Sequence, residues 1–124
     1  MSLQGELRSY TAGAAIAARR IVKFDSADNT VIQAAAATDL SIGVSEWGCS
    51  AAGDQVDIVK CDLALIEFGG TITRGQPITS DANGKAVAAS PATGVNHRII
   101  GFAEVSGVSG DIGEVWLDKG YLQG

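Results

Sequence analysis

The side chains of this chain that could carry out nucleophilic or metal chemistry are few. His97 is the only histidine, so a metal site built on two imidazoles is excluded and a catalytic triad has one possible base. Cys49 or Cys61 would need a basic neighbour to become a reactive thiolate. Cys61 instead lies in an apolar stretch beside Asp62, which opposes thiolate formation. A small hydrolase would require one of these cysteines beside His97, and we expect His97 to be an exposed structural residue in a loop.

Two pairs of carboxylates stand close together in the sequence, Asp25 with Asp28 and Asp54 with Asp57. The first pair belongs to a turn whose Asp and Asn residues hydrogen-bond their own backbone. Asp57 alternates with the apolar residues around it, which places it on the outer face of a strand. We therefore interpret both pairs as solvated structural residues and not as a general acid and base.

The loops do not match known ion or phosphate motifs. Residues 25–29 and 81–84 lack the spacing of a calcium loop. Residues 69–75 lack the Gly-Lys-Ser/Thr ending of a phosphate loop. The sequence therefore predicts no catalytic residue, no metal and no cofactor.

Composition limits the class of protein. The 124 residues form one domain, with 46% hydrophobic and only 19% charged residues, below the usual ~25%. Surfaces made of small uncharged residues are common in subunits that pack against another protein. A net charge of −5 gives no electrostatic footprint for nucleic acid.

No apolar run is long enough for a membrane span, and no export signal opens the chain. The two cysteines could form one disulfide. Because no export signal is present, they are expected to be free thiols.

The elements that must position these residues are strands. The longest apolar stretch is residues 53–70, rich in β-branched side chains and bracketed by glycines. Its period-two alternation breaks twice, which predicts a long bent strand or two short ones. Further strands are expected at residues 20–24, 30–34, 40–46, 76–80, 85–89, 98–105 and 112–117, with turns at 25–29 and 81–84, a loop at 90–96 and a tail at 118–124.

An internal repeat relates the two halves of the chain. The series around Asp25, Ile42-Gly43-Val44 and Gly53-Asp54 recurs around Asp81, Ile100-Gly101-Phe102 and Gly110-Asp111, at a spacing of 56 to 58 residues. Neither copy is large enough to bury its apolar face alone. The predicted fold is therefore all-β, a small barrel or sandwich of short antiparallel strands with a pseudo-twofold repeat, its halves at about 19–70 and 71–120.

Residues 1–18 are expected to precede this β domain, which spans residues 19–124. Residues 2–11 show no apolar alternation and predict an extended N-terminal arm. Residues 12–20 favour an irregular or extended segment over a short helix, because Gly13 and the strand that follows outweigh the alanines.

The order of these motifs resembles the small capsid decoration, or cement, proteins of tailed bacteriophages. The resemblance covers roughly residues 19–117 and includes residues 75–78, 84–87, 100–103 and 110–115. It implies a non-enzymatic phage or prophage structural protein that is made in the bacterial host cytoplasm and binds the capsid surface of the virion. It also implies a homotrimer, the major capsid protein as partner, and neither nucleic acid nor membrane as a ligand.

Within that resemblance, the contact residues are expected on the arm and among the large aromatics. Leu3, Leu7 and Tyr10 are the candidates for capsid contact. Trp47, Trp116 and Tyr121 are the candidates for contacts between subunits. An alternative from another class is a small β-barrel binding module for carbohydrate or for a subunit interface, which would expose aromatic side chains together on a concave platform.

Overall fold

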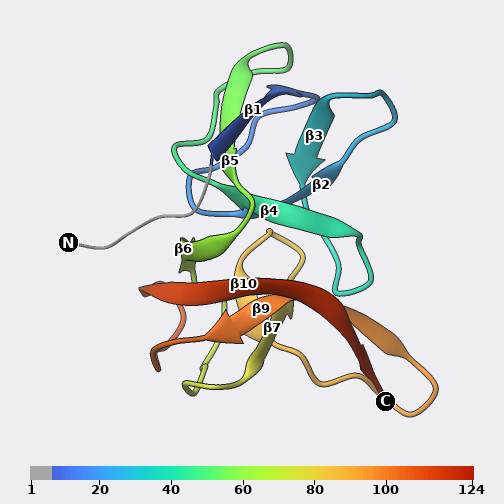
Figure 1. The fold of residues 1–124 in the computed structure, drawn as a ribbon, viewed down its shortest axis with the longest axis vertical. Coiled ribbons are helices and arrows are strands. Elements are labelled where there is room, and N and C mark those ends of the chain that lie inside the picture. The colour runs from blue at the N-terminus through green and yellow to red at the C-terminus, as the bar shows by residue number, and fades with distance from the viewer. Residues whose placement is uncertain (1–6) are drawn as a thin grey trace.

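The computed structural model describes residues 7–124, and this part of the chain contains ten β-strands and no helix (Figure 1). No membrane-spanning helix is therefore present in the described residues. The strands are β1 (Leu7–Ala12), β2 (Ile21–Phe24), β3 (Thr30–Gln33), β4 (Ser41–Ser45), β5 (Gln55–Val59), β6 (Asp62–Glu67), β7 (Pro77–Ser80), β8 (Ala86–Ala88), β9 (Asn96–Ala103) and β10 (Ile112–Gln123). The all-β prediction is confirmed.

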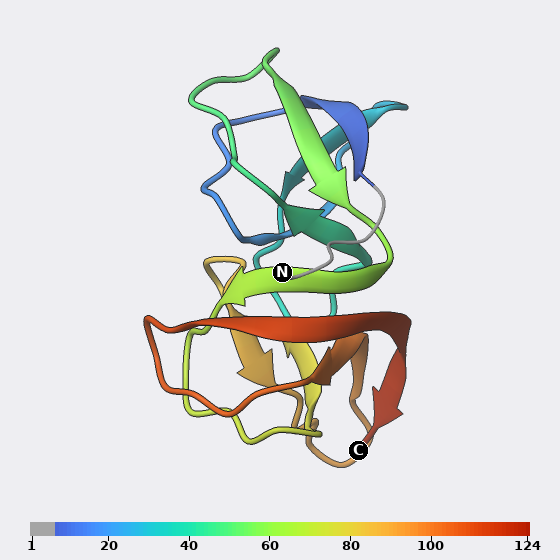
Figure 2. The same cartoon turned by 60° about the vertical axis from the view of Figure 1, so that its left-hand side comes forward.

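The strands form two sheets that lie one above the other in Figures 1 and 2. The first five make a closed barrel in the order β1-β3-β2-β4-β5, and the last five make a sheet in the order β6-β10-β9-β7-β8. If β6 to β10 are matched in order to β1 to β5, both sheets have the same neighbours. The barrel is closed by a parallel pairing of β1 with β3, whereas the matching seam of the second sheet carries a single parallel bridge between Phe68 and Ala86. The predicted repeat is thus confirmed in the strand order.

The repeat extends to individual hydrogen bonds at the Gly-Asp motif. Gly53 and Gly110 have φ values of 89° and 93°, a region that favours glycine. Gly53 donates its N–H to Ala12, and Gly110 donates to Phe68. The aspartate that follows each glycine accepts a backbone N–H three residues back, at 3.1 Å in the first unit and 2.9 Å in the second. The motif recurs because the same turn is built twice.

The long apolar stretch forms the link between the units. It is two strands, β5 and β6, separated at Lys60 and Cys61, and Asp62 begins β6 with a φ of 62°. β5 is the last strand of the barrel, where it pairs with β1, and β6 is the first strand of the second sheet, where it pairs with β10. The repeat boundary predicted at residues 70–71 is therefore wrong, since the two hydrogen-bonded units meet at residues 60–61.

Both ends of the predicted domain also need correction. Leu7–Ala12 is strand β1 of the barrel and not part of a free arm, because it pairs with β5 and β3; residues 1–6 lie outside the described residues. The expected tail at 118–124 instead continues β10 to Gln123, after a register shift between Leu117 and Gly120. Backbone pairing orders both segments despite their weak apolar patterns.

One hydrophobic core spans both units. Ile21, Val44 and Val59 from the barrel pack in the same buried cluster as residues of the second sheet such as Ile66 and Val115. A second cluster, centred on Tyr10, fills the barrel itself. The units therefore form one domain.

The turn between β7 and β8 docks onto the barrel. The Ile21 N–H donates to the Gly84 carbonyl at 2.8 Å. The Asn83 carbonyl accepts from Arg20 Nη1 at 2.9 Å and from Gln33 Nε2 at 2.7 Å. Polar bonds thus fix the second unit on the first in one orientation.

Glu67 adds an ionic clamp at this junction. Its carboxylate pairs with Arg20 and with Lys85, both at 3.2 Å. Burial works to raise the pKa of Glu67, but hydrogen bonds and charge from Lys85 and Arg20 outweigh it and hold the pKa below the ordinary value of 4.5. A lowered pKa contributes stability above the ordinary value, and this contribution is lost as the pH falls through the lowered pKa.

We expect Glu67→Gln to lower the free energy of unfolding by about 1 kcal/mol at pH 7, because both pairs are partly screened by solvent. The difference from wild type should shrink at an acidic pH below the lowered pKa, where Glu67 itself is protonated. Urea titrations at the two pH values measure this, with exposed Glu104→Gln as the matched control. An equal loss at both pH values would contradict the ionic role.

Candidate interaction surfaces

The three residues predicted to contact a capsid differ in their exposure and in whether the structure describes them. Leu3 lies outside the described residues. Leu7 begins β1 and is 49% exposed. Tyr10 is 1% exposed and packs inside the barrel, so its assignment as a surface contact is wrong. Because Tyr10 and Ala12 both point inward, the segment is an ordinary barrel strand.

The three aromatics predicted to contact other subunits are all exposed, with 70% of Trp47, 47% of Trp116 and 59% of Tyr121 accessible. Each has its own surroundings. The Arg19 guanidinium lies 5.9 Å from the Trp47 ring, and that of Arg98 lies 5.2 Å from the Tyr121 ring. Trp116 instead stands on the outer face of the second sheet, where it belongs to a larger apolar feature.

That feature is a row of apolar side chains across four neighbouring strands, which we call the apolar row. Pro77 on β7 pairs with Phe102 on β9, Phe102 with Trp116 on β10, and Trp116 with Leu63 on β6. Phe102 is 41% exposed, and Pro77 and Leu63 are half-buried. Aligned cross-strand partners have side chains close enough to touch, so the row presents a continuous hydrophobic strip to solvent.

Sequence reasoning missed Phe102 and the row it completes. The neighbours of Trp116 on β10, Val115 and Leu117, are buried, as is Ala103 beside Phe102. The alternation of residues 115–117 therefore contained a signal for Trp116. Residues 100–103 gave none for Phe102, because Ile100, two residues before it, is itself buried. What the sequence lacked was the strand register that places Phe102 opposite Trp116.

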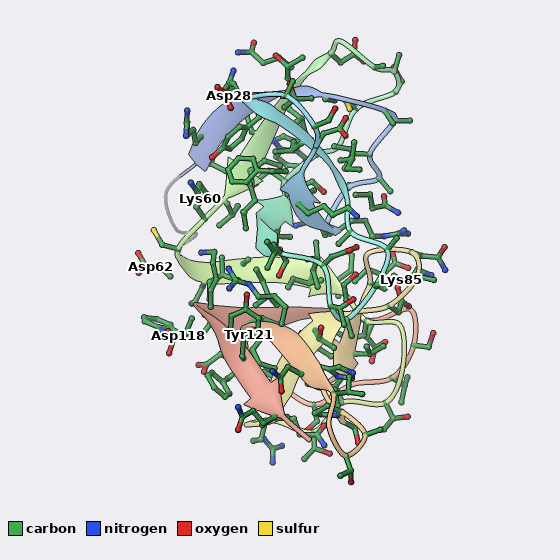
Figure 3. The ribbon with its side chains drawn as sticks, turned by 90° about the vertical axis from the view of Figure 1, so that its right-hand side faces the viewer. Asp28, Lys60, Asp62, Lys85, Asp118 and Tyr121 are labelled. Carbon is green, nitrogen blue, oxygen red and sulfur yellow. The ribbon has the colours of Figure 1, made fainter. Side chains whose placement is uncertain are left out.

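A cluster of basic side chains lies where the two units meet. Lys119 Nζ donates to the Lys60 carbonyl at 2.7 Å. Burial, followed by the charges of Lys60 and Arg98, lowers the pKa of Lys119. In Figure 3, Lys60, Asp62 and Asp118 follow one another down the same edge of the molecule, and Tyr121 lies beside Asp118. Within residues 7–124, neither lysine nor Arg98 forms an ion pair. Arg98 donates through Nε and Nη2 to the Ser41 carbonyl, so the charges of the cluster are not neutralised by a carboxylate.

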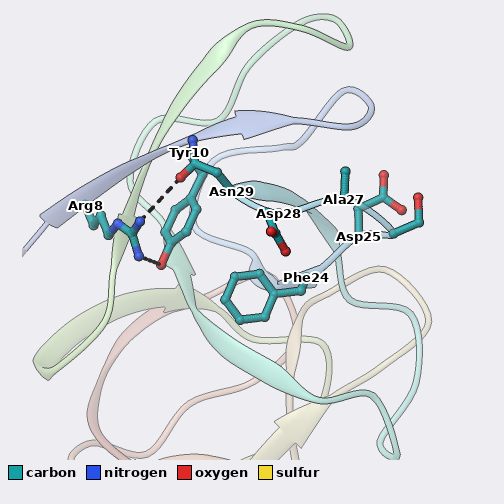
Figure 4. A pocket seen from close by; sticks show the side chains of 8 residues that line it. Arg8, Tyr10, Phe24, Asp25, Ala27, Asp28 and Asn29 are labelled. Atoms are coloured by element: carbon teal, nitrogen blue, oxygen red, sulfur yellow. Dashed lines mark hydrogen bonds between the residues drawn. The ribbon is translucent and has the colours of Figure 1, made fainter.

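The open end of the barrel holds a groove of about 440 Å³, seen in Figure 4. β1 contributes Arg8 and Tyr10, and β2 contributes Phe24. The turn to β3, residues 25–29, supplies the polar rim. Phe24 lies edge-on to Tyr10, with ring centroids 6.0 Å apart.

The residues weighed for catalysis are dispersed. His97 lies in β9, half-buried and with no hydrogen-bond partner at Nδ1, so the expectation of an exposed loop residue is wrong. Cys49 and Cys61 are free thiols of intermediate exposure. Asp57 accepts a hydrogen bond from Ser9 Oγ at 2.7 Å, a structural use. No group of three or more metal-ligating side chains occurs in residues 7–124.

A solved phage protein has the same architecture. The chain is similar in structure to the N base of the head fiber gp8.5 in bacteriophage phi29, with a TM-score of 0.70 and 18% sequence identity. The similarity covers 96% of this chain and 98% of that one. The two proteins share one fold. No protein-family model matches the sequence, and no curated protein matches it.

Proposed function

We propose that this chain is a non-enzymatic structural protein of a phage or prophage virion that binds the outside of the head. The observation that carries the proposal is the likeness to the phi29 head-fibre base, which extends over nearly the whole of both chains. The motif resemblance to capsid decoration proteins supports the same role independently. Surfaces suited to protein contact and a dispersed set of potential catalytic groups agree with a binding function.

The subunits assemble through the apolar row. Row residues Phe102 and Trp116 are large aromatics of the kind that supply most binding energy at interfaces. Glu114 lies two residues before Trp116 on β10, and Glu104 directly follows the end of β9 and donates its N–H to the Glu114 carbonyl. The basic cluster of Lys60, Lys119 and Arg98 offers the opposite charge elsewhere on the surface. A cyclic trimer joins unlike surfaces of identical subunits. Glu104 and Glu114, beside the apolar row of one copy, therefore meet the basic cluster of the next copy.

The head is contacted through the N-terminal side of the barrel. Leu7 is exposed there at the start of β1, directly after residues 1–6. The major capsid protein is the partner. Binding at the junctions between capsid subunits adds buried contacts that stabilise the shell against internal pressure.

Native mass by light scattering tests the assembly. We expect a trimer for the wild type and a monomer for the double variant Phe102→Ser/Trp116→Ser, because removing two aromatic anchors costs several times RT per contact. Leu40→Ser, an exposed apolar residue on the barrel, is the matched control and should remain trimeric. A trimer that survives the double variant would rule out the apolar row as its interface.

Cosedimentation with empty heads of the phage that encodes the chain tests the virion role. Wild-type protein should sediment with the heads at a fixed ratio to the capsid subunits, and a variant lacking residues 1–6 should bind much less. Absence of wild-type binding would contradict the proposed function.

A further inference from the structure

The side chains in the groove at the open end of the barrel differ from those at the matching positions of the second unit. Arg8, Tyr10 and Phe24 occupy positions that the second unit fills with Ala64, Ile66 and Ser80, by the matched registers of β1 with β6 and β2 with β7. All three counterparts are buried. At this end the second unit thus has small or aliphatic side chains that are buried, whereas the first unit has aromatic and polar side chains that line a groove.

The turns differ in the same way. In the second unit the turn after β7 is used internally, since Asp81 Oδ1 accepts the N–H groups of Asn83 and Lys85 and the turn docks onto the barrel. In the first unit the side chains of Asp25 and Asp28 make no hydrogen bond within residues 7–124 and line the groove. Asp25 Oδ2 lies against Gly13, as Asp81 Oδ2 lies against Gly69, so the exposed Asp28 carboxylate is the one that is free to accept hydrogen bonds from a ligand.

The aromatic part of the groove offers a flat apolar surface. Phe24 is 50% exposed, and its edge-on contact with Tyr10 holds the ring at the groove wall. Arg8 lies with its guanidinium 4.6 Å from the Tyr10 ring centre and donates to the Tyr10 hydroxyl at 3.1 Å. The ring and the guanidinium therefore stand in fixed positions around a space of about 440 Å³, within the usual range for small-ligand sites.

From this geometry we propose that the groove is a carbohydrate-binding site for a neutral or amino pyranose. The C–H face of a pyranose packs on an aromatic ring such as Phe24, as apolar surfaces do. The Asp28 carboxylate accepts hydrogen bonds from its hydroxyls. The Asn29 amide nitrogen donates to them, since Asn29 Oδ1 already accepts from Arg8 Nη2 at 3.4 Å.

Arg8 and Lys60, whose Nζ lies 5.6 Å from the Tyr10 ring centre, offset the charges of Asp25 and Asp28. The carboxylate beside the Phe24 ring in Figure 4 is that of Asp28, which disfavours uronic and sialic acids at this ring.

Binding is tested by NMR titration of the full chain with methyl glycosides of glucose, galactose, mannose and N-acetylglucosamine, together with glucosamine and glucuronate. We expect at least one neutral or amino sugar to shift the amide signals of residues 24–29 with a Kd of about 1–10 mM, typical of a single-sugar contact. Glucuronate should bind at least about fivefold more weakly. No shift with any member at about 100 mM, or equal binding of glucuronate, would overturn the proposal.

Three variants separate stacking from general apolarity. Phe24→Tyr should keep the affinity, whereas Phe24→Leu should weaken binding about tenfold because a branched aliphatic chain offers no flat face. Leu40→Ala, on a different loop of the barrel, should bind as wild type does. Unchanged affinity in Phe24→Leu would overturn the assignment. The virion role is measured separately by head binding, so either proposal can fail without the other.

Discussion

Phe68→Ala should destabilise the protein by about 4 kcal/mol, the largest effect of any single truncation that we expect. Phe68 is fully buried in the core that joins both units. Its ring lies against Gly107 and Gly113, where even a Cβ atom would come within 3 Å of the ring. Neighbours without side chains cannot move in to fill the space, so most of the cavity would remain.

Equilibrium denaturation, repeated over a range of protein concentrations so that association is recognised, measures this loss. The matched control is Ile112→Ala, which shortens an exposed apolar side chain of the same sheet outside the apolar row and should cost less than about 1 kcal/mol. A loss for Phe68→Ala as small as that of the control would contradict the packing described for this core.

The repeat also predicts how to repair the cavity. The first unit has Ala12, Cys49 and Val56 where the second has Phe68, Gly107 and Gly113. At these three positions the second unit therefore has one large residue beside two glycines, and the first unit has one small residue beside two larger ones. Adding Gly107→Cys and Gly113→Val to Phe68→Ala should recover about half of the lost stability, because volume is restored.

Gly101→Ala should cost about 3 kcal/mol, the second largest effect. A Cβ at Gly101 would clash with the Trp116 carbonyl oxygen and lie 2.9 Å from the carbonyl carbon. Both atoms are backbone of the paired strand β10, so relief requires the strands to separate and not a side chain to rotate. Gly43 meets the Val59 carbonyl oxygen in the same way in the barrel.

Gly120→Ala is the control for this prediction. Gly120 lies in the same pair of strands, opposite Ile99, and a Cβ there would meet no atom within 4 Å. Its replacement should change stability by less than about 0.5 kcal/mol. Similar melting temperatures for Gly101→Ala and wild type would show that β9 and β10 tolerate a wider spacing than the structure gives them.

The sequence predicted the fold class and most strands because their signals are local. Turn residues such as Asp25 and Gly84, and the alternation around Val56 and Ile58, act within a few positions of the chain. The broken alternation of residues 53–70 indicated two strands or a bend, and β5 and β6 meet at that point. The repeat was visible because Gly53 and Gly110 are needed for the same turn.

What the sequence could not predict depends on pairing between distant segments. β1 has few apolar residues, and its burial of Tyr10 follows from its position between β3 and β5. The C-terminal part of β10 is ordered by β9. The apolar row requires the register of four strands, and the groove requires β1 to lie beside the turn after β2. Tertiary context decided each of these features.

The docking of the second unit through the Gly84 carbonyl has a consequence for the length of this architecture. A third unit added in the same manner would need, on β7, the N–H that Ile21 provides on β2. The matching first residue of β7 is Pro77, which has no N–H to give. The second unit therefore cannot receive a further unit through this contact, and the docking seen between these two units cannot be repeated in the same way.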